Sequence, residues 1–270
     1  MDNNKLSGIL KLKNVNIYFE TLGNGNPLAL IPGLCGTCDS FGLITSELSK
    51  YFKLILIDNR GAGRTKSHKK IYTVSDMADD VNELAEHLNL DKINILGHSM
   101  GGFIAQEYAL KYPQKTAKVI LSNTYSVNSA RNIELFGCFL KMLREGCSWE
   151  SWHRIFSLWI FSEKFIENKL DYETNIKLSV NYPFHQTIDD FEEQLNACNS
   201  HDMTDRLKYI SSDVLTVYGT KDILITPEES IQMGEKIKNN VFYAIKNSAH
   251  LPMFENADEY IRIIKNFINQ

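Results

Sequence analysis

The chain has 270 residues, of which 43% are hydrophobic, so it can bury one large core. Its net charge of −4 argues against binding to nucleic acid or to an anionic membrane, which both select basic surfaces. No apolar run reaches the ~18 residues of a membrane span, and the first residues do not resemble a signal peptide. We therefore expect a cytoplasmic protein.

Apolar runs alternate with amphipathic stretches, a pattern that predicts an α/β fold with a mostly parallel central sheet flanked by helices. Residues 9–21 alternate apolar and polar side chains and predict an antiparallel hairpin at the sheet edge. Continuous apolar runs are typical of strands that are covered on both faces. Such runs occupy residues 28–31, 54–57, 93–96, 119–121 and 214–218, and the apolar run at residues 241–245 predicts a further strand.

The segment Cys35-Gly36-Thr37-Cys38 has the spacing of a redox pair or of half a zinc site. No second Cys or His pair with ligand spacing accompanies it, so we interpret it as a loop and expect neither a metal nor an organic cofactor. The five cysteines are an odd number, which favours reduced thiols. Further along, residues 58–65 contain two glycines but fit no phosphate-binding pattern, and we interpret them as a structural loop beside the active-site mouth.

Residues 73–89 predict an amphipathic helix whose acidic residues, Asp80 among them, face water. The apolar positions from Ala257 to Ile268 predict a last helix of the same kind. Between residues 124 and 203 helix-like runs replace strand-like ones, and all three tryptophans lie there. We expect residues 1–123 and 204–270 to form the core, and residues 124–203 to form a helical insertion.

The pentapeptide Gly97-His98-Ser99-Met100-Gly101 stands between an apolar run and a helix-like run. A serine at such a junction lies on a tight turn that exposes its hydroxyl group. Glycine is needed on either side because a side chain there would collide with the neighbouring helix or strand. We therefore predict that Ser99 is a nucleophile, and we interpret His98 as a packing residue.

A serine hydroxyl needs a base, and the base needs a partner that fixes its tautomer. Asp222 and His250 each follow a late predicted strand, in the order Ser, Asp, His. We assign His250 as the general base and later the general acid, and Asp222 as the orienting carboxylate. The rival position for the acid, residues 122–124, reads Ser-Asn-Thr and offers no carboxylate.

The oxyanion of the tetrahedral intermediate needs hydrogen-bond donors, each of which contributes about 3 kcal/mol to transition-state stabilisation. One donor is expected to be the backbone N–H of Met100, which follows the nucleophile. The second is expected to be the backbone N–H of Leu34, in the loop 32–36 after an early strand.

These motifs together resemble the α/β-hydrolase superfamily over nearly the whole chain. The chain is most similar to small single-cap esterases and lactonases, of the 3-oxoadipate enol-lactonase-like and pimeloyl-acyl carrier protein methyl ester esterase-like groups. The resemblance implies that residues 124–203 form a cap over Ser99. Many members of the superfamily have His-Gly where this chain has Pro32-Gly33. The segments that carry the resemblance are residues 31–34, 58–63, 97–102, 218–222 and 248–250.

The leading hypothesis is a serine hydrolase that cleaves carboxylic esters or lactones through an acyl-enzyme. Hydrolysis of a carbon–carbon bond, acyl transfer and a non-catalytic ligand receptor are the alternatives. The aromatic residues Phe136, Phe139 and Trp159 either bind an apolar part of a small-molecule substrate or form the core of the insertion. Basic residues of the insertion either form a patch for an acyl-carrier protein or a solvated helix face; they are Arg131, Lys141, Arg144 and Arg154.

Overall fold

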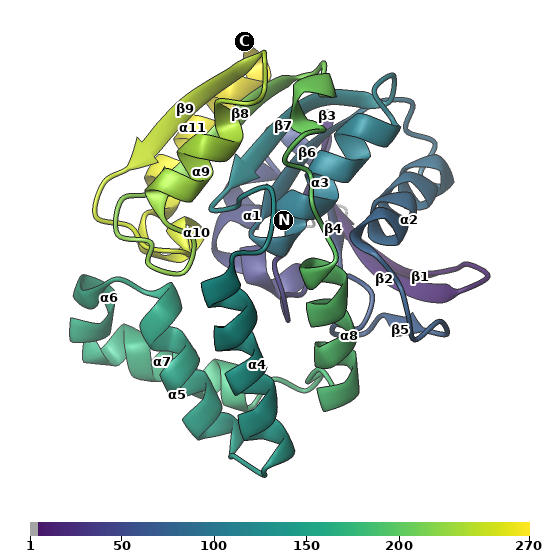
Figure 1. Ribbon diagram of the computed structural model, residues 1–270. Coiled ribbons are helices and arrows are strands. Elements are labelled where there is room, and N and C mark those ends of the chain that lie inside the picture. The colour runs from purple at the N-terminus through teal and green to yellow at the C-terminus, as the bar shows by residue number, and fades with distance from the viewer. Residues whose placement is uncertain (1–4) are drawn as a thin grey trace.

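The computed structural model describes residues 5–270, and one twisted sheet forms its centre (Figure 1). The strand order is β1-β2-β4-β3-β6-β7-β8-β9, and the short strand β5 pairs with β2. The strands are β1 (Leu6–Lys11), β2 (Val15–Leu22), β3 (Asn26–Ile31), β4 (Phe52–Ile57), β5 (Lys66–Ser67), β6 (Ile93–His98), β7 (Thr116–Ser122), β8 (Asp213–Gly219) and β9 (Asn240–Ile245).

The sheet combines an antiparallel edge with a parallel centre. β1, β2 and β4 pair antiparallel, whereas every neighbouring pair from β4 through β3 to β9 is parallel. The edge hairpin and the six apolar runs expected from the sequence all lie within these strands. The prediction of a mostly parallel sheet is therefore confirmed.

Helices cover both faces of the sheet and bury two separate apolar layers. One layer contains side chains of α2 (Val74–His87), α3 (Met100–Lys111) and α9 (Pro227–Gly234). The opposite layer contains side chains of α1 (Gly42–Leu48), α10 (Pro252–Glu255) and α11 (Ala257–Asn269). Two short 3₁₀ turns, η1 (Cys38–Phe41) and η2 (Leu207–Tyr209), complete the core.

The amphipathic pattern of α2 is observed, with one exception. Met77, Val81 and Leu84 are buried, and Thr73 caps the first turn together with Asp76. Asp80, however, is only 3% exposed and forms an ion pair with the buried guanidinium of Arg60, so the expectation that it faces water is wrong. The partner lies in the loop after β4, and helical periodicity cannot reveal such a partner.

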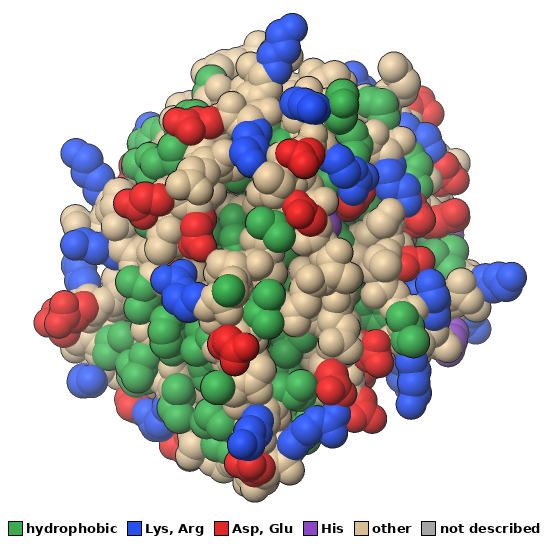
Figure 2. All heavy atoms as spheres, viewed as in Figure 1, with side chains coloured by type: hydrophobic (Ala, Val, Ile, Leu, Met, Phe, Trp, Pro, Cys, Tyr) green, Lys and Arg blue, Asp and Glu red, His purple; other side chains and the backbone are tan. Residues whose placement is uncertain are grey.

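Five helices between β7 and β8 form a separate layer below the sheet in Figure 1. The connections into and out of this layer run side by side, because Val127 and Asp202 form an antiparallel bridge. Figure 2 shows hydrophobic side chains at the surface of this layer, where Leu158, Leu170 and Leu178 are exposed. The five helices are α4 (Ala130–Arg144), α5 (Trp149–Ile160), α6 (Glu163–Glu167), α7 (Lys169–Val180) and α8 (Ile188–Asn199).

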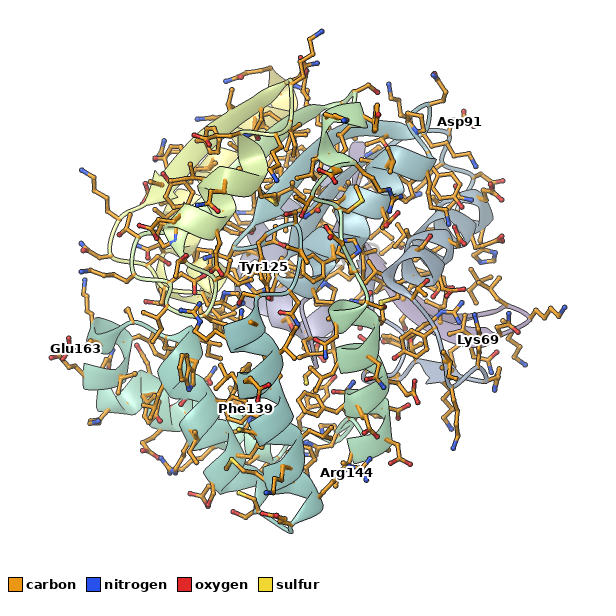
Figure 3. The ribbon with its side chains drawn as sticks, viewed as in Figure 1. Lys69, Asp91, Tyr125, Phe139, Arg144 and Glu163 are labelled. Carbon is orange, nitrogen blue, oxygen red and sulfur yellow. The ribbon has the colours of Figure 1, made fainter. Side chains whose placement is uncertain are left out.

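Ion pairs tie the helices of this layer together. Arg144 at the end of α4 contacts Glu192 on α8, and Figure 3 shows Arg144 at the base of that helix pair. Arg154 on α5 contacts Glu173 on α7 at 2.8 Å. Among the described residues, no helix combines the length and the apolar character that crossing a membrane requires.

Candidate active site

Ser99 occupies a sharp turn between β6 and α3, with φ 54° and ψ −121°. The turn requires glycine on both sides. A Cβ atom on Gly97 would lie 2.1 Å from the carbonyl oxygen of Gly101. A Cβ atom on Gly101 would lie 2.1 Å from the carbonyl oxygen of Ile31. The two glycines therefore allow Ser99 to adopt a strained backbone conformation. Backbone strain of this kind is typical of functional sites.

Asp222 and His250 form a buried hydrogen-bonded pair, each with 3% of its surface exposed. The Oδ2 atom of Asp222 lies 2.8 Å from Nδ1 of His250. The Oδ1 atom accepts hydrogen bonds from the backbone N–H groups of Leu224 and Ile225, both at 3.0 Å. Because an ionised carboxylate only accepts, Nδ1 of His250 carries the proton and Nε2 can act as a base.

Asn123 and His98 position this pair through hydrogen bonds. The sequence pattern did not predict this role for either residue. Asn123 donates from Nδ2 to Oδ2 of Asp222 at 2.9 Å and to the carbonyl oxygen of Ala249 at 3.1 Å. His98 lies 2.8 Å from the carbonyl oxygen of His250 through its Nε2 atom. A carbonyl only accepts, so His98 donates from Nε2, and burial lowers its pKa to about 3.

His98 is thus a neutral hydrogen-bond donor rather than a packing residue. The backbone N–H of His250 is also engaged, since it donates to the carbonyl oxygen of Ile160 at 3.1 Å. Ile160 is the last residue of α5, so the helical layer contacts the backbone of His250 directly. Both main-chain polar groups of His250 are therefore fixed before any substrate arrives.

The loop after β3 lies against the nucleophile. A Cβ atom on Gly33 would lie 2.9 Å from Cβ of Ser99, so only glycine fits there. Asn59 donates from Nδ2 to the carbonyl oxygen of Pro32 at 2.9 Å, and the N–H of Cys35 donates to Oε1 of Gln194 at 3.2 Å. These contacts hold the loop from both ends.

The two predicted oxyanion donors come from the loop after β3 and from the first turn of α3. Leu34 is in the loop just described and lines the same cavity as Ser99. Met100 is the first residue of α3, and the first N–H groups of a helix have no partner within the helix. This placement is compatible with their predicted role, which stays a prediction.

Hydrogen bonds from the loop 58–65 anchor this region. Asp58 is fully buried and accepts hydrogen bonds from the N–H of Cys38 at 2.7 Å and from the N–H of Arg64 at 2.9 Å. All five cysteines are free thiols, and burial raises the pKa of Cys35 and Cys38, so both stay protonated and weakly nucleophilic. Within residues 5–270, no group of three or more His, Cys, Asp or Glu side chains is arranged to hold a metal.

Ser99 and His250 line one cavity of about 220 Å³, and Leu34, His98 and Leu224 also line it. A second cavity of about 410 Å³ lies farther out, between the helical layer and the loop after β3. The two cavities are adjacent because they share lining residues, which are Cys35, Ser40, Trp152, His153, Asn175, Ser179 and Phe254.

The three aromatic residues expected to bind substrate are placed differently from one another. Phe136 lines the inner cavity. Phe139, labelled on α4 in Figure 3, packs its ring 5.4 Å from Trp152 and 5.5 Å from Phe156, inside the helical layer. Neither Phe139 nor Trp159 lines either cavity, so for these two the structure favours the alternative of a core within the insertion.

A serine on a strand–helix turn that lines one cavity with a histidine, itself hydrogen-bonded to an aspartate, is an arrangement typical of hydrolases. The family model for the alpha/beta hydrolase fold matches residues 26–139. A solved alpha/beta hydrolase from a Medee basin deep-sea metagenome library, MGS-M2, is similar with a TM-score of 0.90. It is 22% identical and the match covers 97% of this chain and 98% of that one.

Two curated relatives match along most of their length. A protein of Serratia proteamaculans named as a carbamate hydrolase, RutD, is 25% identical, covering 92% of this chain and 94% of the relative. A pimeloyl-[acyl-carrier protein] methyl ester esterase of Nitrosospira multiformis is 26% identical, covering 94% of this chain and 98% of the relative. The chain therefore has the α/β-hydrolase fold and is similar to small hydrolases of this fold, an esterase among them.

Proposed function

We propose that this protein is a serine hydrolase that cleaves carboxylic esters or lactones through an acyl-enzyme intermediate. One observation carries the proposal. His250 is hydrogen-bonded to Asp222 at 2.8 Å and lines the same cavity as the half-buried Ser99. Packing alone does not explain why Ser99, Asp222 and His250, which follow three different strands, gather at one edge of the sheet. Their proposed roles as nucleophile, orienting acid and base do explain it.

In the first half-reaction, Oγ of Ser99 attacks the carbonyl carbon while Nε2 of His250 takes the hydroxyl proton. The resulting oxyanion accepts hydrogen bonds from the N–H groups of Leu34 and Met100. Asp222 stabilises the imidazolium without taking its proton. The tetrahedral intermediate then collapses, the bond to the leaving oxygen breaks, and His250 gives that oxygen its proton.

In the second half-reaction, water attacks the acyl carbon of the ester on Ser99, and His250 accepts a proton from this water. The second tetrahedral intermediate uses the same two N–H donors. Its collapse breaks the bond to Oγ of Ser99, and the proton on His250 returns to that atom. The free acid leaves, and the enzyme is restored with no change in charge.

The relatives widen the list of carbonyl substrates that deserve testing. One is named as a carbamate hydrolase and another as a methyl ester esterase, and both substrates present a carbonyl carbon to a nucleophile. Carbon–carbon bond hydrolysis and acyl transfer stay predictions, because the same three residues serve them equally.

A carrier-protein substrate is less well supported than a free small ester. The four basic residues considered for such a contact each lie close to a carboxylate, so the helical layer has little uncompensated positive charge there. The pairs are Arg131–Glu229 at 3.6 Å, Lys141–Glu145 at 3.7 Å, Arg154–Glu173 at 2.8 Å, and Arg144–Glu192.

The test compares the wild-type protein with Ser99→Ala on p-nitrophenyl butyrate and on a panel of methyl esters, lactones and carbamates. Ser99→Ala should lower kcat at least about 10⁴-fold and abolish covalent labelling by a fluorophosphonate. Ser46→Ala, an exposed serine on α1, is the matched control and should change neither. Folded wild-type protein with no turnover and no labelling would instead favour the non-catalytic receptor.

A further inference from the structure

The outer cavity is larger than a short ester needs. The inner cavity holds about 220 Å³ and the adjoining one about 410 Å³, and His153 lies at the junction because it lines both. Aromatic rings from two parts of the helical layer surround the outer space, among them Trp149, Tyr182 and Phe184. A substrate that reacts at Ser99 can therefore extend a second, bulky group through the junction.

The described side chains that line the two cavities include a negative charge but no lysine or arginine to balance it. Within the described residues 5–270, no lysine or arginine lines either cavity. Of the residues that the structure describes, Asp39 at the outer cavity is the only one that places a carboxylate on the walls. Burial lowers the pKa of His98 to about 3 and that of His153 to about 4, so both imidazoles are neutral at physiological pH.

Arg64, which contacts Asp39 at the cavity wall, does not supply the missing positive charge, because carboxylates already surround it. Arg64 lies 2.8 Å from Asp58, 3.2 Å from Asp39 and 3.7 Å from Glu20. Tyr182 donates its hydroxyl to Asp39 at 2.9 Å, which closes this cluster at the cavity wall. A carboxylate entering the outer cavity would meet Asp39 and find no free cation.

One neutral polar group is available at the junction. The Nε2 atom of His153 is buried and has no hydrogen-bond partner among the described residues. A neutral imidazole can serve one oxygen or one N–H of a ligand, but it does not offset a full negative charge. The outer cavity is also lined by the imidazole of His185, which stacks on Trp149 and donates from Nε2 to the carbonyl oxygen of Val180 at 3.0 Å. Apart from Asp39 and this imidazole, the walls of the outer cavity are apolar or carry uncharged amides and hydroxyls, as at Asn175 and Ser179.

We propose that the enzyme selects elongated esters or lactones whose second group is uncharged and apolar, and that it rejects those with a free carboxylate at that end. This inference rests on the proposed hydrolase function. The outer cavity takes the uncharged group and His153 contacts a polar atom near its middle. A carboxylate that loses part of its hydration against these apolar walls without gaining a cation is unfavourable, and Asp39 adds repulsion.

The direct test uses two esters that differ in one charge. Dimethyl suberate and monomethyl suberate share the same chain, and only the second carries a free carboxylate at pH 7.5. After halving the diester rate for its two equivalent ester groups, kcat/KM should favour the diester on the order of 100-fold. Raising the salt concentration to 0.5 M should reduce this preference only in part, because salt screens the repulsion from the exposed carboxylate of Asp39 but not the loss of hydration.

A paired variant tests the location of the selecting cavity. Leu178→Lys places a cation at the wall of the outer cavity and should raise kcat/KM for monomethyl suberate about 10-fold, with little change for the diester. Leu170→Lys is the matched control, since Leu170 is exposed on the same helix α7 and lines neither cavity. It should leave both substrates unchanged.

The outcomes separate the two proposals. Wild-type protein that cleaves the monoester within threefold of the corrected diester rate overturns the charge selection and leaves the serine hydrolase proposal standing. Equal gains from Leu178→Lys and Leu170→Lys would show that the selection does not reside in the outer cavity. Protein that cleaves neither ester and is not labelled at Ser99 overturns both proposals.

Discussion

Replacing Asp222 by asparagine tests the proposed acid with almost no change in shape. Two backbone N–H groups, from Leu224 and Ile225, point at Oδ1, so the oxygen of the new amide must take that position. The NH₂ group then faces two donors, Nδ2 of Asn123 and Nδ1–H of His250. The imidazole can relieve this conflict only by moving its proton from Nδ1 to Nε2.

An imidazole with its proton on Nε2 cannot accept the proton of Ser99, so the loss should appear in kcat. The same tautomer error in a serine protease costs about 10⁴-fold, and each decade corresponds to 1.36 kcal/mol, so the expected loss is about 5.5 kcal/mol of transition-state stabilisation. Substrate binding should change little, because Asp222 does not line either cavity. KM should therefore stay within a few-fold of the wild-type value.

Stopped-flow and steady-state assays with p-nitrophenyl butyrate between pH 6 and 10 measure the effect, with thermal melts to confirm folding. Asp213→Asn is the matched control, because Asp213 is an exposed carboxylate at the start of the same strand β8. A folded Asp222→Asn protein with at least a tenth of the wild-type kcat would refute the reasoning and place the acid elsewhere.

Two predictions concern stability. Burial lowers the pKa of His98 from 6.5 to about 3, so the unfolded chain binds a proton that the folded chain does not, and stability is lost as pH falls from about 6.5 toward 3. Urea titrations should show that His98→Asn flattens this decline by about 1 kcal/mol per pH unit; equal slopes would contradict the assignment. Phe139→Ala should lower the free energy of unfolding by about 3–5 kcal/mol, because the ring is buried within the helical layer. Its KM for short esters should match the wild-type value, and a large rise in KM would mean that Phe139 contacts substrate.

The strands and the order of site residues follow from the sequence because they depend on local pattern. A strand covered on both faces needs an apolar side chain at nearly every position, and β3, β4 and β6 show this run directly. Parallel strands end at one edge, so residues that follow β8 and β9 are expected to meet there. The observed bond between Asp222 and His250 agrees with that expectation.

Partners far apart in the sequence could not be found in this way. Gln194 on α8 accepts from the N–H of Cys35, which lies 159 residues earlier, and no local pattern announces that contact. The helical layer poses a related problem, because it has two apolar surfaces, one toward its own interior and one toward the cavities. Helical periodicity predicts that both Phe136 and Phe139 are buried. Only the structure shows that Phe136 lines the inner cavity whereas Phe139 packs inside the helical layer.

The contacts of Asn123 favour a position for the proposed acid after β8 rather than after β7. These strands are adjacent and parallel, so Asn123 and Asp222 follow their ends at the same edge. The amide of Asn123 donates to both Oδ2 of Asp222 and the carbonyl oxygen of Ala249, which fixes the loop that carries His250. A carboxylate at position 123 would turn toward these same two acceptors with no proton to give either of them. With Asp222 as the proposed acid, the side chain at position 123 must donate a hydrogen bond to it. An amide at position 123 meets this need, and a carboxylate does not.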